Sequence, residues 1–384
     1  MSSLRGKAAF VGAATGFISS AAGHSALEMM AVVARQAAED AGISLRQVDG
    51  LFTGMQTEFL STLAFAEYLG LRPRFSDNNR VGGSSFLCHV QQAALALDAG
   101  LCDVALICYA SNQRSALGKL QTAVAGNWSE IEAPYEARFP VSSYGLAAAR
   151  HMHEYGTRRE DLAAVALAAR QWAQLNPEAF ARDPLTLDAV LASPMVSDPL
   201  SKLDCCLVTD GAAAVIMTRA DRARSLRRKP VYLLGAAAEH WHKQVSAMED
   251  VCRTAASETG RRAFAEAKVA AADIDVVALY DAFTISTIVL LEDLGFCPKG
   301  EGGRFVSSGA IAPGGSLPVN TNGGGLSCCH PGMYGLFTLT EAIRQLRGEA
   351  GDRQVQGADL ALCQGSGGVF SSQATNILGT EAAL

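Results

Sequence analysis

One histidine lies in a stretch of unusually high glycine content. Five of the 17 residues between Val319 and Gly335 are glycine, and His330 follows two adjacent cysteines and precedes a proline. Glycine at this density lets the backbone turn tightly and approach a ligand closely. An imidazole can also exchange a proton near neutral pH. The stretch therefore predicts acid–base chemistry centred on His330, assisted by side chains from elsewhere in the chain.

The ten cysteines are the other reactive side chains that the sequence offers. None forms a Cys-x-x-Cys pair, many lie in apolar runs, and no apolar signal segment opens the chain. This pattern favours reduced, mostly buried thiols in the cytoplasm over a disulfide framework. Cys328 and Cys329 are too close to His330 in sequence for all three to hold one metal ion, so we expect no metal site here.

Composition excludes several classes of function. Of 384 residues, 49% are hydrophobic and 18% charged, and the formal net charge is −6 without a basic stripe, which argues against nucleic-acid binding. Apolar runs are interrupted well before about 18 residues, so no transmembrane helix is expected. The low charge content indicates that another subunit covers part of the surface.

Alternating strand and helix patterns position the reactive residues. The N-terminal patterns predict strands at 7–14, 48–52, 103–109 and 212–218, and helices at 25–41 and about 85–100. This order implies a parallel sheet with helices on its faces. Residues 112–200 are more polar, carry predicted helices at 144–155 and 159–175, and are interpreted as an insertion that supplies binding surface. The charged run 221–229 is predicted to be a helical connector.

The first pattern returns after Pro230. The C-terminal patterns predict strands at 231–237, 274–280 and 360–363, and helices at 252–267, from 284 and at 334–347. Residues 42–52 parallel 269–279, and residues 100–106 parallel 357–362. We interpret this as an internal duplication, with an N-terminal half at 1–229 and a C-terminal half at 230–384. Two such halves place a site between them, at helix N-termini and strand C-termini.

Several motifs of this chain resemble those of the thiolase superfamily. The matching segments are Asn79–Ser85, Ser201–Gly211, Tyr280–Phe283, Gly323–Gly332 and Cys363–Gly368. The most similar branch includes the thiolase domain of sterol carrier protein X and thiolase-like lipid-transfer proteins. The resemblance implies a layered α-β-α-β-α fold and a coenzyme A thioester as substrate, without a cofactor. It also implies a homodimer and a small OB-fold/zinc-ribbon partner of the DUF35 type.

Family roles carry over to two positions and fail at two others. His330, followed by Pro-Gly, matches the loop histidine that acts as base, and Cys363 matches the cysteine that shuttles a proton. The nucleophilic cysteine is replaced by Gly83 (or Gly82, with a one-residue slip), and Tyr280 replaces the oxyanion-hole Asn or His. The remaining loop residues predicted to bind substrate or its oxyanion are Gly83, Ser84, Gly365 and Gly367.

The missing cysteine changes the expected chemistry. Thiolysis needs a thiolate that holds the acyl group covalently, whereas retro-aldol cleavage needs a base, oxyanion donors and a second acid. His330, Cys363 and Tyr280 can fill these roles, and aldolases of this branch similarly carry tyrosine in the Tyr-Asp-x-Phe motif. Those aldolases have a second tyrosine shortly before the histidine, where this chain has Cys328-Cys329.

We therefore expect a carbon–carbon lyase acting on an acyl-CoA. Two alternatives stay open: an acyltransferase with Cys88 as a relocated nucleophile, and a non-catalytic subunit that binds acyl-CoA. Cys88 is otherwise interpreted as a buried structural thiol, and Ser84 as a helix cap. His240-Trp241-His242 is interpreted as a surface segment, with pocket lining as the alternative. Asp281 is predicted to fix a loop by hydrogen bonds.

Overall fold

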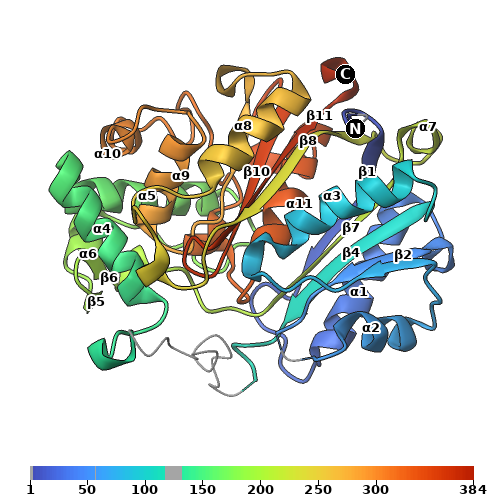
Figure 1. Ribbon diagram of the computed structural model, residues 1–384, viewed down its shortest axis with the longest axis horizontal. Coiled ribbons are helices and arrows are strands. Elements are labelled where there is room, and N and C mark those ends of the chain that lie inside the picture. Colours follow the sequence, from blue (N-terminus) through green and yellow to red (C-terminus); the bar gives the residue numbers. More distant parts are fainter. Residues whose placement is uncertain (1–2, 57, 117–131) are drawn as a thin grey trace.

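Nine strands form one hydrogen-bonded sheet in the computed structural model, which describes residues 3–56, 58–116 and 132–384. From edge to edge the order is β3-β2-β4-β7-β1-β8-β11-β10-β9 (Figure 1). The strands are β1 (Ala8–Gly16), β2 (Gly50–Thr53), β3 (Phe75–Asp77), β4 (Val104–Ser111), β7 (Gly211–Arg219), β8 (Val231–His240), β9 (Val276–Ala278), β10 (Leu360–Gly367) and β11 (Ser372–Gly379). The short strands β5 (Met195–Ser197) and β6 (Leu200–Ser201) pair separately.

Helices lie on both outer faces of the sheet and between its halves. The helices are α1 (Ala26–Ala41), α2 (Ser61–Leu69), α3 (Ser85–Asp98), α4 (Val141–Tyr155), α5 (Arg159–Gln174), α6 (Leu187–Leu191), α7 (Ala220–Ala223), α8 (Ala256–Ala267), α9 (Thr284–Asp293), α10 (Gly302–Ser307) and α11 (Gly335–Arg347). Helix α1 packs on β1, β4 and β7, and α8 packs on β8 and β11. Helices α3 and α11 contact strands of both halves, which gives the expected α-β-α-β-α layering (Figure 1).

The two halves repeat one strand arrangement. In the order β2-β4-β7-β1, the first pair is parallel and the next two are antiparallel. The order β9-β10-β11-β8 has the same sequence of directions. The halves join where β1 pairs with β8 through Phe10 and Ala9. The boundary at residue 230 stays a prediction; residue 230 directly precedes β8.

The expectation of a parallel sheet was wrong for much of its width. Strands β7 and β11 each run antiparallel to both neighbours. A tight turn at residues 368–371 joins β10 to β11, and such a hairpin needs no crossover helix. The predicted helix at 221–229 is also shorter, since α7 ends at Ala223. The Ser225 hydroxyl donates to the Arg222 carbonyl at 2.8 Å, a local side-chain hydrogen bond that competes with continuation of the helix.

Local capping explains why α1 begins and ends where the sequence predicts. The Ser25 hydroxyl accepts the Glu28 backbone N–H, and the Glu28 carboxylate accepts the Ser25 N–H, a reciprocal cap. Gly42 ends the helix with a φ of 72°, which costs glycine little. The helix thus presents a continuous apolar face to β1, β4 and β7.

The insertion at 112–200 packs over one end of the layered core. Helix α5 contacts α9, α10 and the π-helical turn at Gly324–Cys328. Residues 117–131 of the predicted insertion lie outside the described residues. Within the described ranges, no helix is long and apolar enough to cross a lipid bilayer. Through helix α5, the insertion covers the glycine-rich stretch that carries His330.

Candidate active site

His330 and Tyr280 form a hydrogen-bonded pair where the two chain halves meet. Tyr280 follows strand β9 by two residues, and His330 follows the π-helical turn. The Tyr280 Oη lies 2.9 Å from the His330 Nε2. The ring centroids are 5.5 Å apart and the ring planes are at 87°, an edge-to-face arrangement. The pair joins two side chains that are 50 residues apart in sequence.

The N-terminal half fixes the backbone on which His330 is mounted. The Thr209 hydroxyl accepts the His330 N–H at 3.0 Å, and the Gln113 amide donates to the His330 carbonyl at 2.9 Å. The Tyr109 hydroxyl donates to the carbonyl of Pro331 at 2.5 Å. These buried contacts hold three consecutive backbone groups, so the imidazole is positioned before any ligand arrives.

Asp281 fixes the turn that precedes His330. Its carboxylate accepts the Gly325 N–H at 2.6 Å and the Leu326 N–H at 3.4 Å. Gly324 has a φ of 63°, and a Cβ there would strike the Asp281 carboxylate. Burial raises the pKa of Asp281 to about 7, against the lowering effect of the Gly325 hydrogen bond. These contacts are those of a loop-fixing residue.

The Tyr280 ring occupies the space where a nucleophilic side chain at position 83 would lie. A Cβ at Gly83 would be 2.6 Å from the Tyr280 Cζ, and closer still to Cε2. The same Cβ would be 2.7 Å from the carbonyl oxygen of Ser366. Distances below 3.0 Å between carbon atoms are repulsive. The Tyr280 ring in this position therefore requires glycine at position 83.

Burial keeps both members of the pair uncharged. It lowers the pKa of His330 to about 4, because the desolvated imidazolium is disfavoured. It also raises the pKa of the Tyr280 phenol well above its usual value. A neutral imidazole beside a protonated phenol can accept a proton through the phenol oxygen. The geometry therefore suits His330 as a general base that receives the substrate's proton through the Tyr280 hydroxyl.

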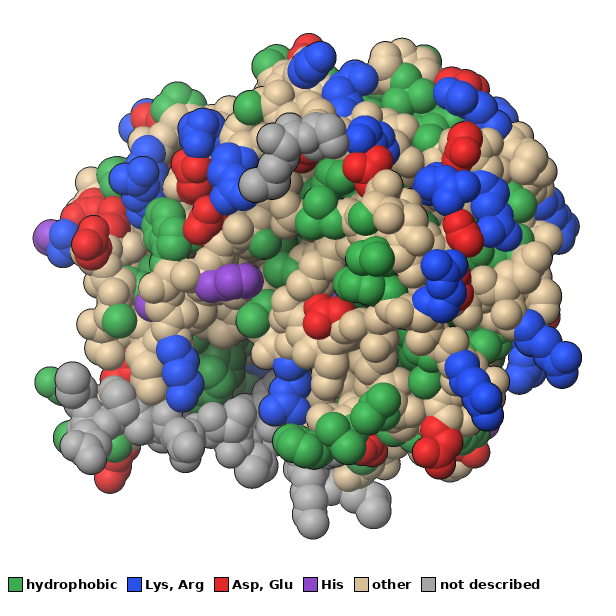
Figure 2. Space-filling view, turned by 45° about the vertical axis from the view of Figure 1, so that its right-hand side comes forward, with side chains coloured by type: hydrophobic (Ala, Val, Ile, Leu, Met, Phe, Trp, Pro, Cys, Tyr) green, Lys and Arg blue, Asp and Glu red, His purple; other side chains and the backbone are tan. Residues whose placement is uncertain are grey.

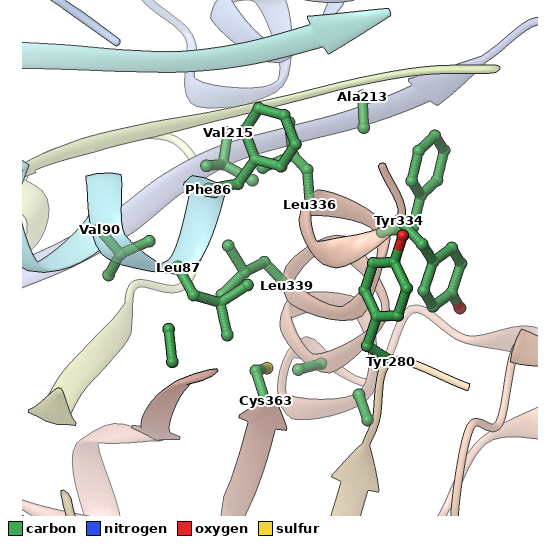
Figure 3. Close-up of a cluster of buried hydrophobic side chains, with 14 of the residues drawn as sticks. Phe86, Leu87, Val90, Ala213, Val215, Tyr280, Tyr334, Leu336, Leu339 and Cys363 are labelled. Carbon is green, nitrogen blue, oxygen red and sulfur yellow. The ribbon is translucent and has the colours of Figure 1, made fainter. Parts of the chain in front are cut away.

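Cys363 lies outside this pair. Its Sγ donates to the Thr338 carbonyl at 3.5 Å, and burial raises the pKa of the thiol far above its usual value. Figure 3 shows Cys363 near Leu339 in an apolar cluster, while Tyr280 and Tyr334 lie at another edge. Among the described hydrogen bonds, none joins Cys363 to His330 or Tyr280. The structure thus pairs the histidine with Tyr280 and not with the predicted cysteine.

Cys88 is a poor candidate for a relocated nucleophile. It lies on α3 with 4% of its surface exposed. Burial raises the pKa of its thiol to about 12, so the reactive thiolate is scarce at neutral pH. The structure therefore agrees with its interpretation as a structural thiol.

The predicted glycines permit close packing of backbones around the site. A Cβ at Gly365 would lie 2.9 Å from the Ser84 Cα, and one at Gly367 would lie 2.9 Å from the Ser84 Oγ. The end of β10 therefore rests directly on the start of α3. The Ser84 hydroxyl does not cap the helix but donates to the Val81 carbonyl at 3.0 Å. Their role toward an oxyanion stays a prediction.

Tyr334 is a site residue that the sequence did not reveal. Its ring lies 6.4 Å from the His330 ring at 20°, and 5.9 Å from the Tyr280 ring at 77°. Its hydroxyl donates to the Asn322 side-chain oxygen at 3.0 Å. The three rings form one aromatic cluster that restricts imidazole movement. The sequence feature that could have indicated Tyr334 is its place four residues after His330, within the same glycine-rich stretch.

A cavity of about 520 Å³ opens beside the site, where Gly82, Gly367 and Gly368 form part of its lining. Its lining residues include Arg80, Gly82, His240, Lys243, Gly367 and Ser372. Gly82 lines the cavity, while its neighbour Gly83 contacts the Tyr280 ring. Figure 2 shows a hollow on this face, flanked by histidine and by basic side chains. His240 and Trp241 are exposed, as predicted for a surface segment, and His240 also lines the cavity, as the alternative interpretation has it.

Comparisons with known proteins agree with this architecture. Residues 237–380 match the family model described as "Thiolase C-terminal domain-like". The chain is 35% identical to an acetyl-CoA acetyltransferase of Methanothermobacter thermautotrophicus, covering 89% of this chain and 91% of that protein. It is also 35% identical to 17-hydroxy-3-oxo-4-pregnene-20-carboxyl-CoA lyase of Mycobacterium tuberculosis, covering 90% and 92%. The solved Ltp2-ChsH2(DUF35) aldolase superposes with a TM-score of 0.90 at 31% identity, covering 98% of this chain and 99% of that one.

Proposed function

The chain belongs to the thiolase superfamily, and from this membership we propose that it is a carbon–carbon lyase that cleaves a β-hydroxyacyl-CoA thioester by a retro-aldol route. One observation carries the proposal: the Tyr280 ring fills the nucleophile's place at Gly83 and bonds to His330 at 2.9 Å. A site so filled cannot hold an acyl group on residue 83. It does hold a base with a phenol in front of it.

Proton removal is the task that we assign to His330 and Tyr280. The substrate's β-hydroxyl gives its proton to the Tyr280 Oη while Oη passes its own proton to the His330 Nε2. This requires the imidazole tautomer with hydrogen on Nδ1. The β-carbon–α-carbon bond then breaks, a carbonyl forms at the β-carbon, and the electron pair moves to the thioester oxygen as an enolate.

Stabilisation of that enolate is assigned to the start of α3. Backbone N–H groups at a helix N-terminus carry partial positive charge and favour a developing anion. Gly83 and Ser84 lie in the last turn before this helix, next to the Tyr280 ring. We propose them as the donors, with Gly365 and Gly367 allowing β10 to close over the same turn.

The cavity beside Gly82 is the proposed entrance for the coenzyme A thioester. Its lining includes Arg80 and Lys243 together with two histidines. Cationic side chains recognise phosphate, and coenzyme A carries phosphates at the end remote from its thioester. The acyl chain can then reach Tyr280 past Gly82 and Gly83.

Two protein partners complete the proposal. The matched Ltp2-ChsH2(DUF35) aldolase contains a DUF35 component, and we propose a DUF35-type partner for this chain. We also propose a homodimer, which fits the 18% charged-residue content. Light scattering of the purified chain, alone and with the partner, tests both assemblies.

Product analysis tests the proposed reaction. The chain and a DUF35-type partner are incubated with a panel of 3-hydroxyacyl-CoA thioesters that have a tertiary β-carbon. We expect a ketone and a shortened acyl-CoA in equal amounts. Free coenzyme A must not be required, because no thiolysis occurs. Turnover that needs free coenzyme A and yields two thioesters would overturn the lyase proposal.

A further inference from the structure

A chain of hydrogen bonds connects the cavity to the start of α3. The His240 Nδ1 lies 2.8 Å from the Ser372 Oγ, which lies 2.7 Å from the Ser84 Oγ. Ser84 donates in turn to the Val81 carbonyl. His240 ends β8 and Ser372 begins β11, and the two are direct cross-strand partners. Strand register therefore brings these residues together although 132 positions separate them in sequence.

This chain of groups reaches the cavity that we assign to the thioester. Both His240 and Ser372 line that cavity, together with Gly82 and Gly367. Ser84 is fully buried behind them. The Ser372 hydroxyl thus has a ring nitrogen on one side, a buried hydroxyl on the other and the cavity in front. A serine between a histidine and a second hydroxyl can pass on a proton, because hydroxyl hydrogens rotate.

The proposed cleavage needs a second acid, which must protonate the α-carbon of the enolate. The enolate that forms must receive a proton at its α-carbon, and His330 has just accepted one from the substrate hydroxyl. Cys363 was predicted to supply that second acid, yet its thiol points to the Thr338 carbonyl from within the apolar cluster. The reaction therefore needs another acid that faces the cavity.

We propose that His240 and Ser372 are the second acid of this lyase, with Ser84 positioning the Ser372 hydroxyl. The inference rests on the proposed function. His240 enters the step as imidazolium and gives its Nδ1 proton to Ser372. Ser372 gives its own hydroxyl proton to the α-carbon of the enolate, and a carbon–hydrogen bond forms.

The protons balance with water as the only other participant. His330 ends the step carrying the proton of the substrate hydroxyl, and His240 ends it neutral. His330 then releases one proton to water, and His240 takes one proton from water. No electron is gained or lost by the protein.

Acid and base each lie next to one of two adjacent glycines. The Tyr280 ring of the His330–Tyr280 pair contacts Gly83, whereas His240 and Ser372 line the cavity together with Gly82. The hydroxyl that loses a proton and the carbon that gains one are two bonds apart in the substrate. Two separate proton-transfer groups are what such a substrate requires.

Deuterium exchange isolates this step from cleavage. In the reverse direction the same groups remove an α-proton from a simple acyl-CoA, so no hydroxyl substrate is needed. The chain with its DUF35-type partner is incubated in D₂O with acetyl-CoA and, separately, propionyl-CoA. Mass spectrometry measures deuterium at the α-carbon over time.

The variants separate a proton-transfer role from a structural one. We expect His240→Gln and Ser372→Ala to lower the exchange rate about 100-fold or more without a matching rise in KM. Ser372→Thr keeps the hydroxyl and should restore most of the exchange. His153→Gln, an exposed histidine on α4, is the matched control and should exchange like the unchanged chain. Thermal unfolding checks that each variant is folded.

The outcomes distinguish the two proposals. Equal exchange in His240→Gln and the unchanged chain overturns the second acid, and so does a lack of exchange by the unchanged chain. Ser372→Ala exchange equal to Ser372→Thr exchange also overturns it. Exchange that depends on His240, without cleavage of any 3-hydroxyacyl-CoA by the unchanged chain, supports these residues as acid–base groups and overturns the lyase proposal alone.

Discussion

The substitution Gly83→Ala probes the contact on which the proposed chemistry depends. The new Cβ would lie 2.6 Å from the Tyr280 Cζ and 2.7 Å from the Ser366 carbonyl oxygen. The Ser366 oxygen belongs to strand β10 and cannot move easily. The Tyr280 ring must therefore shift, which lengthens its 2.9 Å hydrogen bond to His330. One added methyl group should thus prevent proton transfer to His330 although it makes no contact with His330 itself.

The size of the effect follows from two separate terms. Overpacking of a dense interior costs about 1–3 kcal/mol of unfolding free energy, and we expect Gly83→Ala to lie in that range. Loss of an aligned general base lowers the rate by about 10²–10⁴-fold. The cleavage rate should therefore fall much further than the stability alone would explain.

A double-mutant cycle with Tyr280→Ala assigns the cost to this contact. Removing the ring relieves its contact with the new Cβ, although the contact with the Ser366 carbonyl oxygen remains, so the double variant should be more stable than the sum of the single changes by about 0.5–3 kcal/mol. Denaturant unfolding and single-turnover cleavage provide the two readouts. Gly16→Ala is a milder control, because its Cβ would meet only the Val33 side chain, at 3.3 Å, at the end of strand β1. Full cleavage by Gly83→Ala, or strict additivity in the cycle, would refute the reasoning.

Further expectations concern single residues. Tyr280→Phe keeps the ring but removes Oη, so cleavage should fall about 10²–10⁴-fold with little change in melting temperature; retained cleavage would exclude the phenol as proton carrier. Because burial lowers the pKa of His330 to about 4, acidification from pH 8 to 5 should not remove the base, and a fall of kcat/KM below a midpoint near 6.5 would contradict a buried neutral base. The unfolded chain protonates this histidine below about pH 6.5, so its contribution to stability is complete above that pH and is lost as the pH falls toward 4. Cys88→Ala should lower stability yet leave cleavage per folded molecule unchanged; loss of turnover would favour the acyltransferase. Cys363→Ala should change kcat/KM only a few-fold, and a hundredfold loss would restore the predicted pair with His330.

Much of the layered core could be predicted because its strands are continuous apolar runs. Strands β1, β4 and β7 are buried almost throughout, so hydropathy alone locates them. The helix α1 carries both of its end signals in the sequence, Ser25 and Gly42. The glycine-rich stretch and the Tyr280 motif likewise indicated His330 and Tyr280 as site residues, although the predicted partner of His330 was Cys363.

Strand β11 could not be predicted because its buried face is polar. Gln373, Thr375 and Asn376 are fully buried on this strand. The Thr375 hydroxyl bonds to the Thr259 hydroxyl at 2.8 Å, and Gln373 bonds to Gln364. A hydropathy pattern interprets such residues as exposed, whereas hydrogen bonding makes their burial acceptable. Missing this strand also concealed the antiparallel order of the sheet and the Ser372–His240 pair.

Long-range contacts decided the rest of the site. Gly83 and Tyr280 are separated by almost 200 positions, and the exclusion of a side chain at position 83 depends on how the Tyr280 ring and β10 rest on the start of α3. Motif matching placed Cys363 in a catalytic loop, but strand register points its thiol toward α11. Neither fact follows from local sequence, because each depends on the packing of elements that are distant in the chain.

Intact-mass measurement during turnover tests the central claim most directly. The chain and its DUF35-type partner are mixed with a 3-hydroxyacyl-CoA that they cleave. Samples are quenched in acid at intervals, and the intact mass of the chain is measured by mass spectrometry. The account predicts that ketone and shortened acyl-CoA accumulate while the mass of the chain stays unchanged at every interval. An acyl adduct that forms and decays at the rate of turnover, on Cys88 or on any other residue, would contradict it.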